Sequence, residues 1–429
     1  MTTISLAEWQ AETFSHLTLA PADRQLAETL NQQRRLEILE LRQGLRLRSR
    51  SWVGVVKFSH FSVVIEPKLS GGRAGLVQML ELTTGLRALR QYRTDRELQI
   101  LNQYGLFDLL ALLFAQACER VIRRGLRAAY FEQEELIPVV RGRLLAAEQV
   151  RRHFGRIDQL ACRYDDHLLD HIDNQILTSA VAVCRTRVQD RALQARLQRL
   201  YFILAAASSH LRQPPAEVKA ELIYNRLNDF YQPAHELAFI LLEGMGIEDL
   251  LAADRTRSFA FLLNMNSLFE QFVERYLGFV LAGSDIRLES QVVDRTFIRE
   301  RRSGRGYSIR PDLVARRGPY FAMPLDAKYK AYDDRRVSNA DLYQLFLYAQ
   351  AYARGMSPPA AALIYPSEQR QPQLAEVDFH RHGASLAQLT IWGLPLQPAL
   401  AEMSANERGP ISQKLLAHLD QLGRLITVT

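Results

Sequence analysis

Residues Arg310–Lys330 read RPDLVARRGPYFAMPLDAKYK, and the interpretation of the whole chain starts from them. Two apolar runs flank the sequence Arg-Arg-Gly-Pro, which is typical of a turn, so the stretch predicts a β-hairpin. With the turn centred on Pro319, Asp312 lies opposite Asp326, and side chains that face each other across an antiparallel pair have Cβ atoms about 5 Å apart. Lys328 follows Asp326 by two residues and therefore projects from the same face.

Two carboxylates placed so close together repel each other unless a proton or a cation lies between them. Mg²⁺ suits such a place because it binds a few carboxylate oxygens and keeps several waters; Mn²⁺ is the alternative ion. A lysine beside the metal orients or activates a water, or stabilises charge on a phosphate. The hairpin therefore predicts a metal-dependent catalytic site. The other interpretation is a charged hairpin packed between two core helices.

The pattern Pro-Asp, a gap, then Asp-x-Lys in this hairpin resembles the PD-(D/E)xK nuclease superfamily. Downstream, Gln344 and Tyr348 lie in the sequence QLFLY, which is similar to the Q-L-x-x-Y helix motif of many of these nucleases. Residues four apart lie on one helix face. Upstream, Asn264–Leu277 resembles the helix that opens the nuclease core, with Glu270 as its acidic residue.

This resemblance implies roles for the residues of the motif. Lys328 would position the attacking water or stabilise the transition state, and Gln344 and Tyr348 would support the site or contact the DNA strand. Glu270 would hold a second metal or polarise a ligand. The metal ligands that the resemblance implies are Asp312, Asp326, Glu270 and the backbone carbonyl of Ala327.

Three further segments, Gly54–Leu69, Arg141–Leu144 and Leu160–Leu177, follow one another at spacings that resemble the McrC family. McrC is the nuclease subunit of modification-dependent (type IV) restriction systems, which serve antiviral defence. The similarity runs over most of the chain. It implies a Mg²⁺-dependent DNA endonuclease that works with McrB, an AAA+ GTPase. The N-terminal region would cap, insert into and stimulate the hexameric ring of this partner, which recognises and translocates the modified DNA.

The length of 429 residues predicts two or three domains, and an apolar fraction of 48% is ample for packed cores. Alternating Leu and Arg at 45–48 and apolar runs at 52–56 and 61–66 predict strands, whereas 76–89 and 101–126 have helical periodicity. We expect an α+β protein with a mixed N-terminal region, a helical centre and a C-terminal nuclease-like α/β core. The expected domains are 1–160 (partner binding), 161–257 (helical connector) and 258–429 (endonuclease).

The net charge of +7, mostly from arginine, permits nucleic-acid binding without establishing it. Basic residues are dense around the hairpin, and phosphate contact is a natural use for them. The candidates for DNA binding are Arg301, Arg302, Arg310 and Lys330. The other interpretation of this region is a mobile basic loop around Ser303–Gly306.

A second polar cluster, which contains His167 and His171, suggests a metal site if the two histidines share a helix face. Without an H-E-x-x-H string, a structural role is the favoured interpretation, as it is for Asn174. Cys118, Cys162 and Cys184 each lie in an apolar stretch expected to be helical, and buried thiols are the favoured interpretation. They form no C-x-x-C pair, which excludes the common zinc and iron–sulfur motifs and indicates a reducing cytosol. Neither a signal peptide nor a membrane-spanning run appears, so we expect a cytoplasmic protein.

No G-x-x-x-x-G-K-[ST] string occurs, so any nucleotide-driven movement along DNA requires another subunit. Two alternatives stay open. The chain is either another PD-(D/E)xK nuclease of repair or recombination, which would cut without a GTPase partner, or a non-catalytic adaptor that regulates an AAA+ ring. The complete Asp, Asp, Lys set argues against the adaptor.

Overall fold

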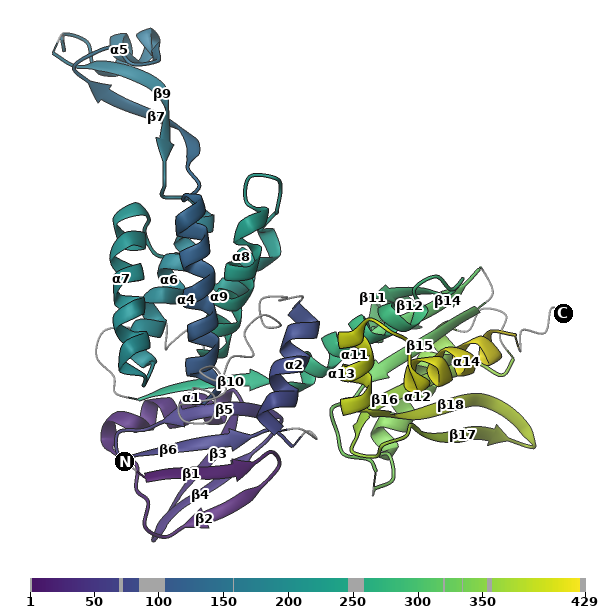
Figure 1. Ribbon diagram of the computed structural model, residues 1–429. Coiled ribbons are helices and arrows are strands. Elements are labelled where there is room, and N and C mark those ends of the chain that lie inside the picture. The colour runs from purple at the N-terminus through teal and green to yellow at the C-terminus, as the bar shows by residue number, and fades with distance from the viewer. Residues whose placement is uncertain are drawn as a thin grey trace. The chain divides into compact units, whose positions relative to one another are not determined.

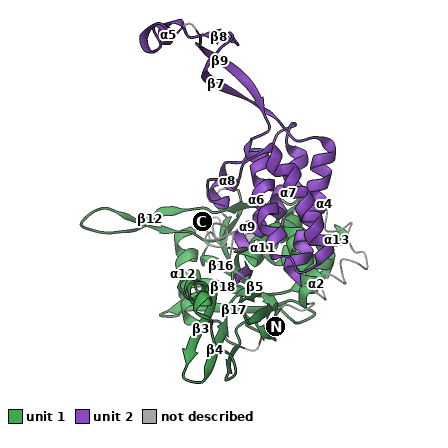
Figure 2. Cartoon of the chain, turned by 90° about the vertical axis from the view of Figure 1, so that its left-hand side faces the viewer, with its two compact units in different colours: residues 1–92, 262–429 green, residues 93–261 purple. Residues whose placement is uncertain are grey.

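The computed structural model describes residues 2–68, 72–84, 105–156, 158–245, 258–318, 321–333, 335–352 and 357–424. The chain is a mixed α and β protein with two compact units (Figure 2). The first unit comprises Met1–Tyr92 and Leu262–Thr429, and the second comprises Arg93–Phe261. The first unit is therefore built from both ends of the chain, with the second unit inserted between them.

The N-terminal part of the first unit contains two sheets, as the strand periodicity predicted (Figure 1). Leu45 and Leu47 are buried while Arg46 and Arg48 are exposed, because alternate side chains of a strand point to opposite faces. One sheet has the order β1-β6-β5-β10: β1 (Thr2–Ala7), β6 (Phe61–Glu66), β5 (Trp52–Lys57) and β10 (Phe259–Asn264). The other has the order β2-β4-β3: β2 (Ala11–Phe14), β4 (Gly44–Ser49) and β3 (Leu36–Leu41). The helices here are α1 (Arg24–Gln32) and α2 (Gly72–Thr84).

The C-terminal part of the first unit is a six-stranded sheet with helices (Figure 1). Its order is β11-β14-β15-β16-β18-β17: β11 (Arg287–Ser290), β14 (Leu313–Arg317), β15 (Phe321–Ala327), β16 (Ala360–Ser367), β18 (Ala384–Pro395) and β17 (Gln373–Arg381). Strands β15, β16 and β18 are parallel, and the remaining pairs are antiparallel. The helices are α11 (Met265–Leu281), α12 (Asn339–Tyr352), α13 (Leu396–Ala405) and α14 (Pro410–Arg424). A separate two-stranded ribbon consists of β12 (Asp294–Arg299) and β13 (Gly306–Ile309).

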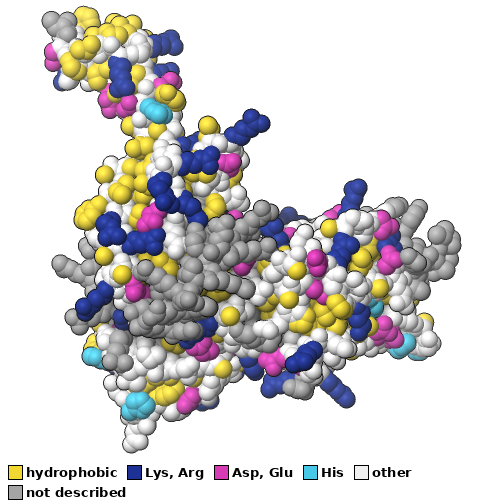
Figure 3. All heavy atoms as spheres, in the orientation of Figure 1, with side chains coloured by type: hydrophobic (Ala, Val, Ile, Leu, Met, Phe, Trp, Pro, Cys, Tyr) yellow, Lys and Arg dark blue, Asp and Glu magenta, His cyan; other side chains and the backbone are white. Residues whose placement is uncertain are grey.

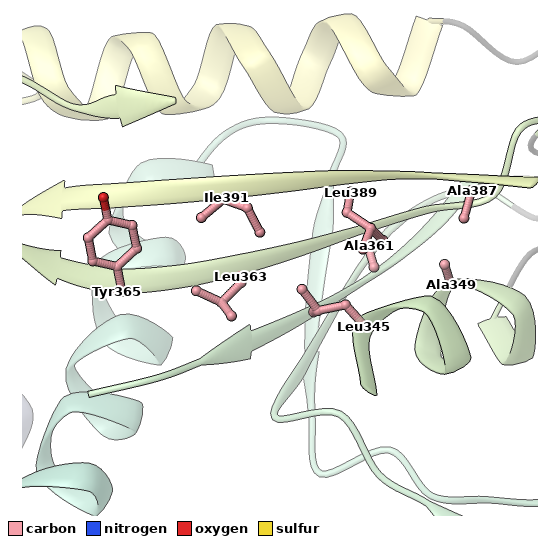
Figure 4. Close-up of a cluster of buried hydrophobic side chains, with 8 residues drawn as sticks. All are labelled: Leu345, Ala349, Ala361, Leu363, Tyr365, Ala387, Leu389 and Ile391. Carbon is pink, nitrogen blue, oxygen red and sulfur yellow. The ribbon is translucent and has the colours of Figure 1, made fainter. Parts of the chain in front are cut away.

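Helix α12 follows β15 and is fixed to the sheet by a buried apolar cluster (Figure 4). Leu345 and Ala349 of α12 contact side chains of β16 and β18, and both are fully buried. The sheet contributes Ala361, Leu363, Tyr365, Ala387, Leu389 and Ile391. Because burying a leucine stabilises by about 1.5–3 kcal/mol, this contact holds the helix at a defined position on the sheet.

The second unit combines a helical bundle with a projecting β-arm (Figures 1 and 2). The bundle helices are α4 (Leu106–Arg124), α6 (Ile172–Arg187), α7 (Arg191–Ala207), α8 (Pro215–Glu221) and α9 (Gln232–Met245). The arm contains β7 (Ala129–Ile137), β8 (Arg143–Leu144), α5 (Ala146–Arg152) and β9 (Leu160–Leu168), in a sheet of order β7-β9-β8. The helical centre is confirmed, and residues 130–150 form part of the arm. Residues 85–89 and 101–104, predicted as helix ends, lie outside the described residues.

Strand β9 corrects two expectations for this region. His167 lies in β9 and stacks on Tyr130 of β7, whereas His171 is the N-cap of α6, so the two histidines do not share a helix face. Cys162, expected in a helix, is also in β9, although it is buried as predicted. The reason is that β9 pairs with β7 along its whole length, up to Leu168 opposite Ala129. This pairing keeps the polar residues before Leu168 in an extended conformation.

Asn174 joins the two ends of the arm to the bundle. Its side-chain amide donates to the carbonyl oxygens of Arg127, just before β7, and Leu169, just after β9, at 2.8 and 2.7 Å. Its carbonyl oxygen accepts from Tyr231 Oη at 2.7 Å, and Tyr231 Oη in turn accepts from the Arg127 amide. Beside it, Asp173 is fully buried and pairs with the Arg127 guanidinium at 2.6 Å. This network fixes the base of the arm, as the structural interpretation of Asn174 expected.

Replacing Asn174 with Ala removes the donor to both ends of the arm and leaves buried groups without partners, which costs about 3 kcal/mol locally. We expect faster hydrogen exchange at the amides of β7 and β9 nearest the bundle. Exchange in β16 of the first unit serves as an internal control and should not change. Equal protection of β7 and β9 in variant and wild type would contradict the assigned role.

Candidate functional site

The β14–β15 hairpin brings the two predicted carboxylates together. Leu313 pairs with Leu325, so the same antiparallel register continues to Asp312 opposite Asp326, as the turn position predicted. The turn residue Pro319 itself lies outside the described residues. Asp312 Oδ2 accepts a hydrogen bond from the amide of Ala327 at 2.8 Å, which holds this carboxylate across the end of β15.

Asp326 is almost completely buried, with 2% of its surface exposed. Lys328 Nζ lies 2.7 Å from its Oδ2, so the two form an ion pair. The geometry of this contact does not make a hydrogen bond, and Oδ2 has no hydrogen-bond donor among the described residues. The ammonium of Lys328 is thus the cation that compensates this buried oxygen among the described residues.

The acidic groups of the site all have raised pKa values. Burial, followed by the charge of Asp312, raises the pKa of Asp326 to about 6 even though Lys328 opposes the shift. Burial is also the main cause of the raised pKa values of Asp312 and Glu270, and the charge of Asp326 adds to the shift at Glu270. The surroundings of the cluster thus disfavour the charged forms of these carboxylates, mainly through burial, and a bound cation opposes this effect.

Helix α12 supports the segment that leads into Asp312. Gln344 Nε2 donates to Tyr348 Oη at 2.7 Å, and Tyr348 Oη donates to the backbone carbonyl of Arg310 at 3.0 Å. Tyr348 is only 7% exposed. These two bonds tie α12 to the backbone two residues before Asp312, and the roles of Gln344 and Tyr348 stay predictions.

The predicted DNA-binding residues differ in whether their charges are already paired with a carboxylate. Lys330 Nζ lies 2.7 and 3.0 Å from the two carboxylate oxygens of Asp341, so its charge is already paired. Arg301, Arg302 and Arg310 are exposed. In the part of the chain that the structure describes, these three arginines have no carboxylate within 4.0 Å. They are therefore better placed than Lys330 to meet an external anion.

Glu8 was not predicted from the sequence. Its side chain contacts Tyr329, the residue that follows Lys328. Glu8 is 2% exposed, and its Oε2 accepts from Tyr329 Oη at 2.7 Å and from the amide of Lys68 at 2.8 Å. Burial raises the pKa of Glu8 to about 7. The Tyr329 ring also contacts Phe269 of α11, next to Glu270. No motif indicates a contact between residues 321 positions apart, so no local signal was available.

The donor set at the hairpin fits Mg²⁺. It comprises the carboxylates of Asp312 and Asp326 and the carbonyl of Ala327, all oxygen, and Mg²⁺ in proteins commonly takes one or two carboxylates with waters and substrate phosphates. Over the described ranges, no group of three or more His, Cys, Asp and Glu side chains is arranged to hold a metal. Two carboxylates and one carbonyl leave room for several waters around such an ion.

Helices long and apolar enough to cross a membrane are absent from the described part of the chain.

Comparisons with known proteins agree with this architecture. The family model described as McrBC 5-methylcytosine restriction system component matches residues 47–366. A chain of the Thermococcus gammatolerans assembly of McrB AAA+ hexamers with bound McrC is similar, with a TM-score of 0.61 and 19% identity, over 98% of this chain and 100% of that chain. A chain of the T. gammatolerans McrBC complex also matches, with a TM-score of 0.45 and 20% identity, over 65% of this chain and 88% of that chain. No curated protein matches.

The likeness to the first Thermococcus chain bears on the fold alone, because so few residues are identical. The family model is decisive, since it spans more than half of the sequence and includes the Asp312–Lys328 hairpin. The chain therefore belongs to the family of McrBC 5-methylcytosine restriction system components.

Proposed function

We propose that this chain is the Mg²⁺-dependent DNA endonuclease subunit of an McrBC-like restriction system, acting in the cytoplasm. The observation that carries this proposal is the pair of carboxylates at opposed positions of the hairpin, the half-buried Asp312 and the buried Asp326, with Lys328 in an ion pair with Asp326. A helix before the hairpin, α11, carries Glu270, and the helix after it, α12, carries Gln344 and Tyr348. This arrangement supports a PD-(D/E)xK nuclease core.

In the proposed mechanism, Asp312, Asp326 and the Ala327 carbonyl hold the metal, with Glu270 as a further ligand or a group that polarises one. A bound Mg²⁺ supplies Lewis-acid polarisation of the phosphate and lowers the pKa of a bound water. The ammonium of Lys328, kept charged by Asp326 despite its burial, orients the attacking water and stabilises negative charge on the phosphorane. Tyr348 keeps the backbone before Asp312 in place.

The partner that we propose is an McrB-like AAA+ GTPase hexamer, as in the Thermococcus assembly of McrB hexamers with bound McrC. Residues 1–160 are assigned to this contact, residues 161–257 to a connector and residues 258–429 to DNA cleavage. The arm supports the assignment, because its surface carries exposed apolar side chains (Figure 3), and contiguous patches of this kind mark protein interfaces. They include Tyr130, Val139, Val140, Val150 and Phe154. The partner would recognise the modified DNA.

The metal site is tested with Asp326→Ala. Removing this carboxylate should lower Mg²⁺-dependent cleavage of modified DNA, with the cognate GTPase present, by at least about 10²- to 10³-fold. DNA binding should change little because the exposed arginines remain. The matched control is Asp378→Ala, which removes an exposed carboxylate from β17 of the same sheet. Near-normal cleavage by Asp326→Ala would remove this residue from the site.

The role of the lysine is tested separately with Lys328→Met, which keeps the length of the side chain but removes the ammonium. We expect metal binding, measured by titration calorimetry, to persist while the single-turnover cleavage rate falls by about 10²-fold or more. Wild-type rates in this variant would show that Lys328 has no catalytic role.

The need for a partner is tested with the unaltered chain. Cleavage by this chain without any GTPase would favour a repair or recombination nuclease.

A further inference from the structure

The β12–β13 ribbon is an ordered hairpin with closely packed strands. Asp294 Oδ1 accepts from the amides of Thr296 and Phe297 at 2.6 and 3.0 Å, which fixes the start of the ribbon. Gly306 lies so close to Arg295 that a Cβ on Gly306 would collide with the Arg295 carbonyl oxygen. Figure 2 shows the ribbon extending from the rest of the first unit. Residues 303–306, for which a mobile loop was the other interpretation, therefore close a hairpin.

The base of the ribbon is attached to the same helix that supports the site. Ile298 packs against the cluster formed with Tyr348 and Tyr352 of α12. Tyr352 Oη donates to the carbonyl of Val292 at 3.0 Å. The ribbon then continues through Arg310 into the candidate metal ligand Asp312. The ribbon thus ends three residues before Asp312, and its base is held on the helix that supports the site.

The exposed surface of the ribbon combines cations with aromatic rings. Five arginines, none with a carboxylate within 4.0 Å among the described residues, are exposed: Arg295, Arg299, Arg301, Arg302 and Arg305. On the neighbouring hairpin, by contrast, Arg316 pairs with Glu289 and Arg317 with Asp285. Phe297 and Tyr307 are 47% and 59% exposed. Such rings are costly in water unless a partner covers them.

We propose that the β12–β13 ribbon binds the DNA duplex beside the phosphate that is cut. A two-stranded ribbon fits a DNA groove. Its arginines would contact the phosphate backbone in bidentate fashion, and Phe297 and Tyr307 would press against sugars and base edges. The inference rests on the proposed function, which supplies DNA as the substrate. It assigns new contacts to Arg295, Arg299 and the two aromatic residues.

Two double variants separate the ionic contact from the aromatic contact. Both are made in the full chain that also carries Asp326→Ala, because this substitution prevents cleavage of the DNA probe. With a short DNA duplex, Arg295→Gln plus Arg299→Gln should weaken binding about tenfold and reduce the slope of log K against log salt by about 2. Phe297→Ala plus Tyr307→Ala should weaken binding about 5- to 100-fold without changing that slope. Fluorescence anisotropy across a salt series measures both quantities.

The matched control is Arg370→Gln plus Arg381→Gln, which removes the same charge from exposed positions outside the ribbon. Ribbon variants that bind like this control would overturn the proposal. Metal-dependent cleavage of modified DNA by the chain without substitutions, with the cognate GTPase present, is measured alongside. If it persists while the ribbon variants bind normally, the ribbon assignment fails and the proposed function stands. If duplex DNA is neither bound nor cut, both fail.

A second inference has an independent basis in the bond between Glu8 and Tyr329. This bond is buried and joins the end of β1 to the residue that follows Lys328. We infer that Glu8 is a positioning residue, which holds the backbone of Lys328 through Tyr329. Glu8 Oε2 takes both donors, Tyr329 and the amide of Lys68, whereas Oε1 has no donor in the described structure. Glu8→Gln therefore keeps both bonds, whereas Glu8→Ala and Tyr329→Phe remove the link.

The test compares single-turnover cleavage by these variants in the full chain. Tyr329→Phe and Glu8→Ala should slow cleavage about tenfold at unchanged affinity for DNA, and Glu8→Gln should restore the rate. Tyr276→Phe is the matched control, because it removes a similar bond from a buried tyrosine, to Glu402 on α13. Equal rates for Tyr329→Phe and Tyr276→Phe would overturn the inference and leave the proposed function untouched.

Discussion

The structure of the candidate site depends on one unfavourable interaction, the placement of two aspartates opposite each other in a buried hairpin. Burial favours the neutral form of both groups and raises the pKa values of Asp312 and Asp326; the charge of Glu270 adds to the shift at Asp312, and the charge of Asp312 adds to the shift at Asp326. A nearby lysine compensates only in part, since its ammonium pairs with one aspartate without completing a hydrogen bond. The folded chain therefore holds these groups together at a cost that its other contacts must offset.

Those other contacts act mainly on the backbone around the hairpin. The apolar face of α12 packs on β16 and β18, and its tyrosines hold the carbonyls of Val292 and Arg310. The amide of Ala327 holds Asp312, and Glu8 holds Tyr329 from the other side. Each contact restricts a segment that carries a site residue. The arrangement is preorganised, so the metal and phosphate of the proposed function would bind with little reorganisation.

Local physical rules explain what the sequence could predict. The turn sequence set the register of β14 and β15, and a period of two placed Asp326 and Lys328 on one face, so the hairpin was predicted correctly. The strand alternation at 45–48 is confirmed for the same reason. His167 was misplaced because its spacing from His171 suits a helix, while pairing with β7, a non-local contact, keeps β9 extended. Glu8 was missed because its partner is far along the chain and no local pattern encodes that contact.

The insertion of the second unit between the two parts of the first has a consequence for biosynthesis. Domains fold as units while the chain leaves the ribosome, starting from the N-terminal side. Residues 93–261 can complete their contacts as soon as they emerge, but Glu8, just after β1, waits for Tyr329, 321 positions later. The carboxylate pair is thus assembled only after most of the polypeptide has been made. A nascent or truncated chain carries the arm long before it carries a finished hairpin, which separates in time the part assigned to partner binding from the part assigned to cutting.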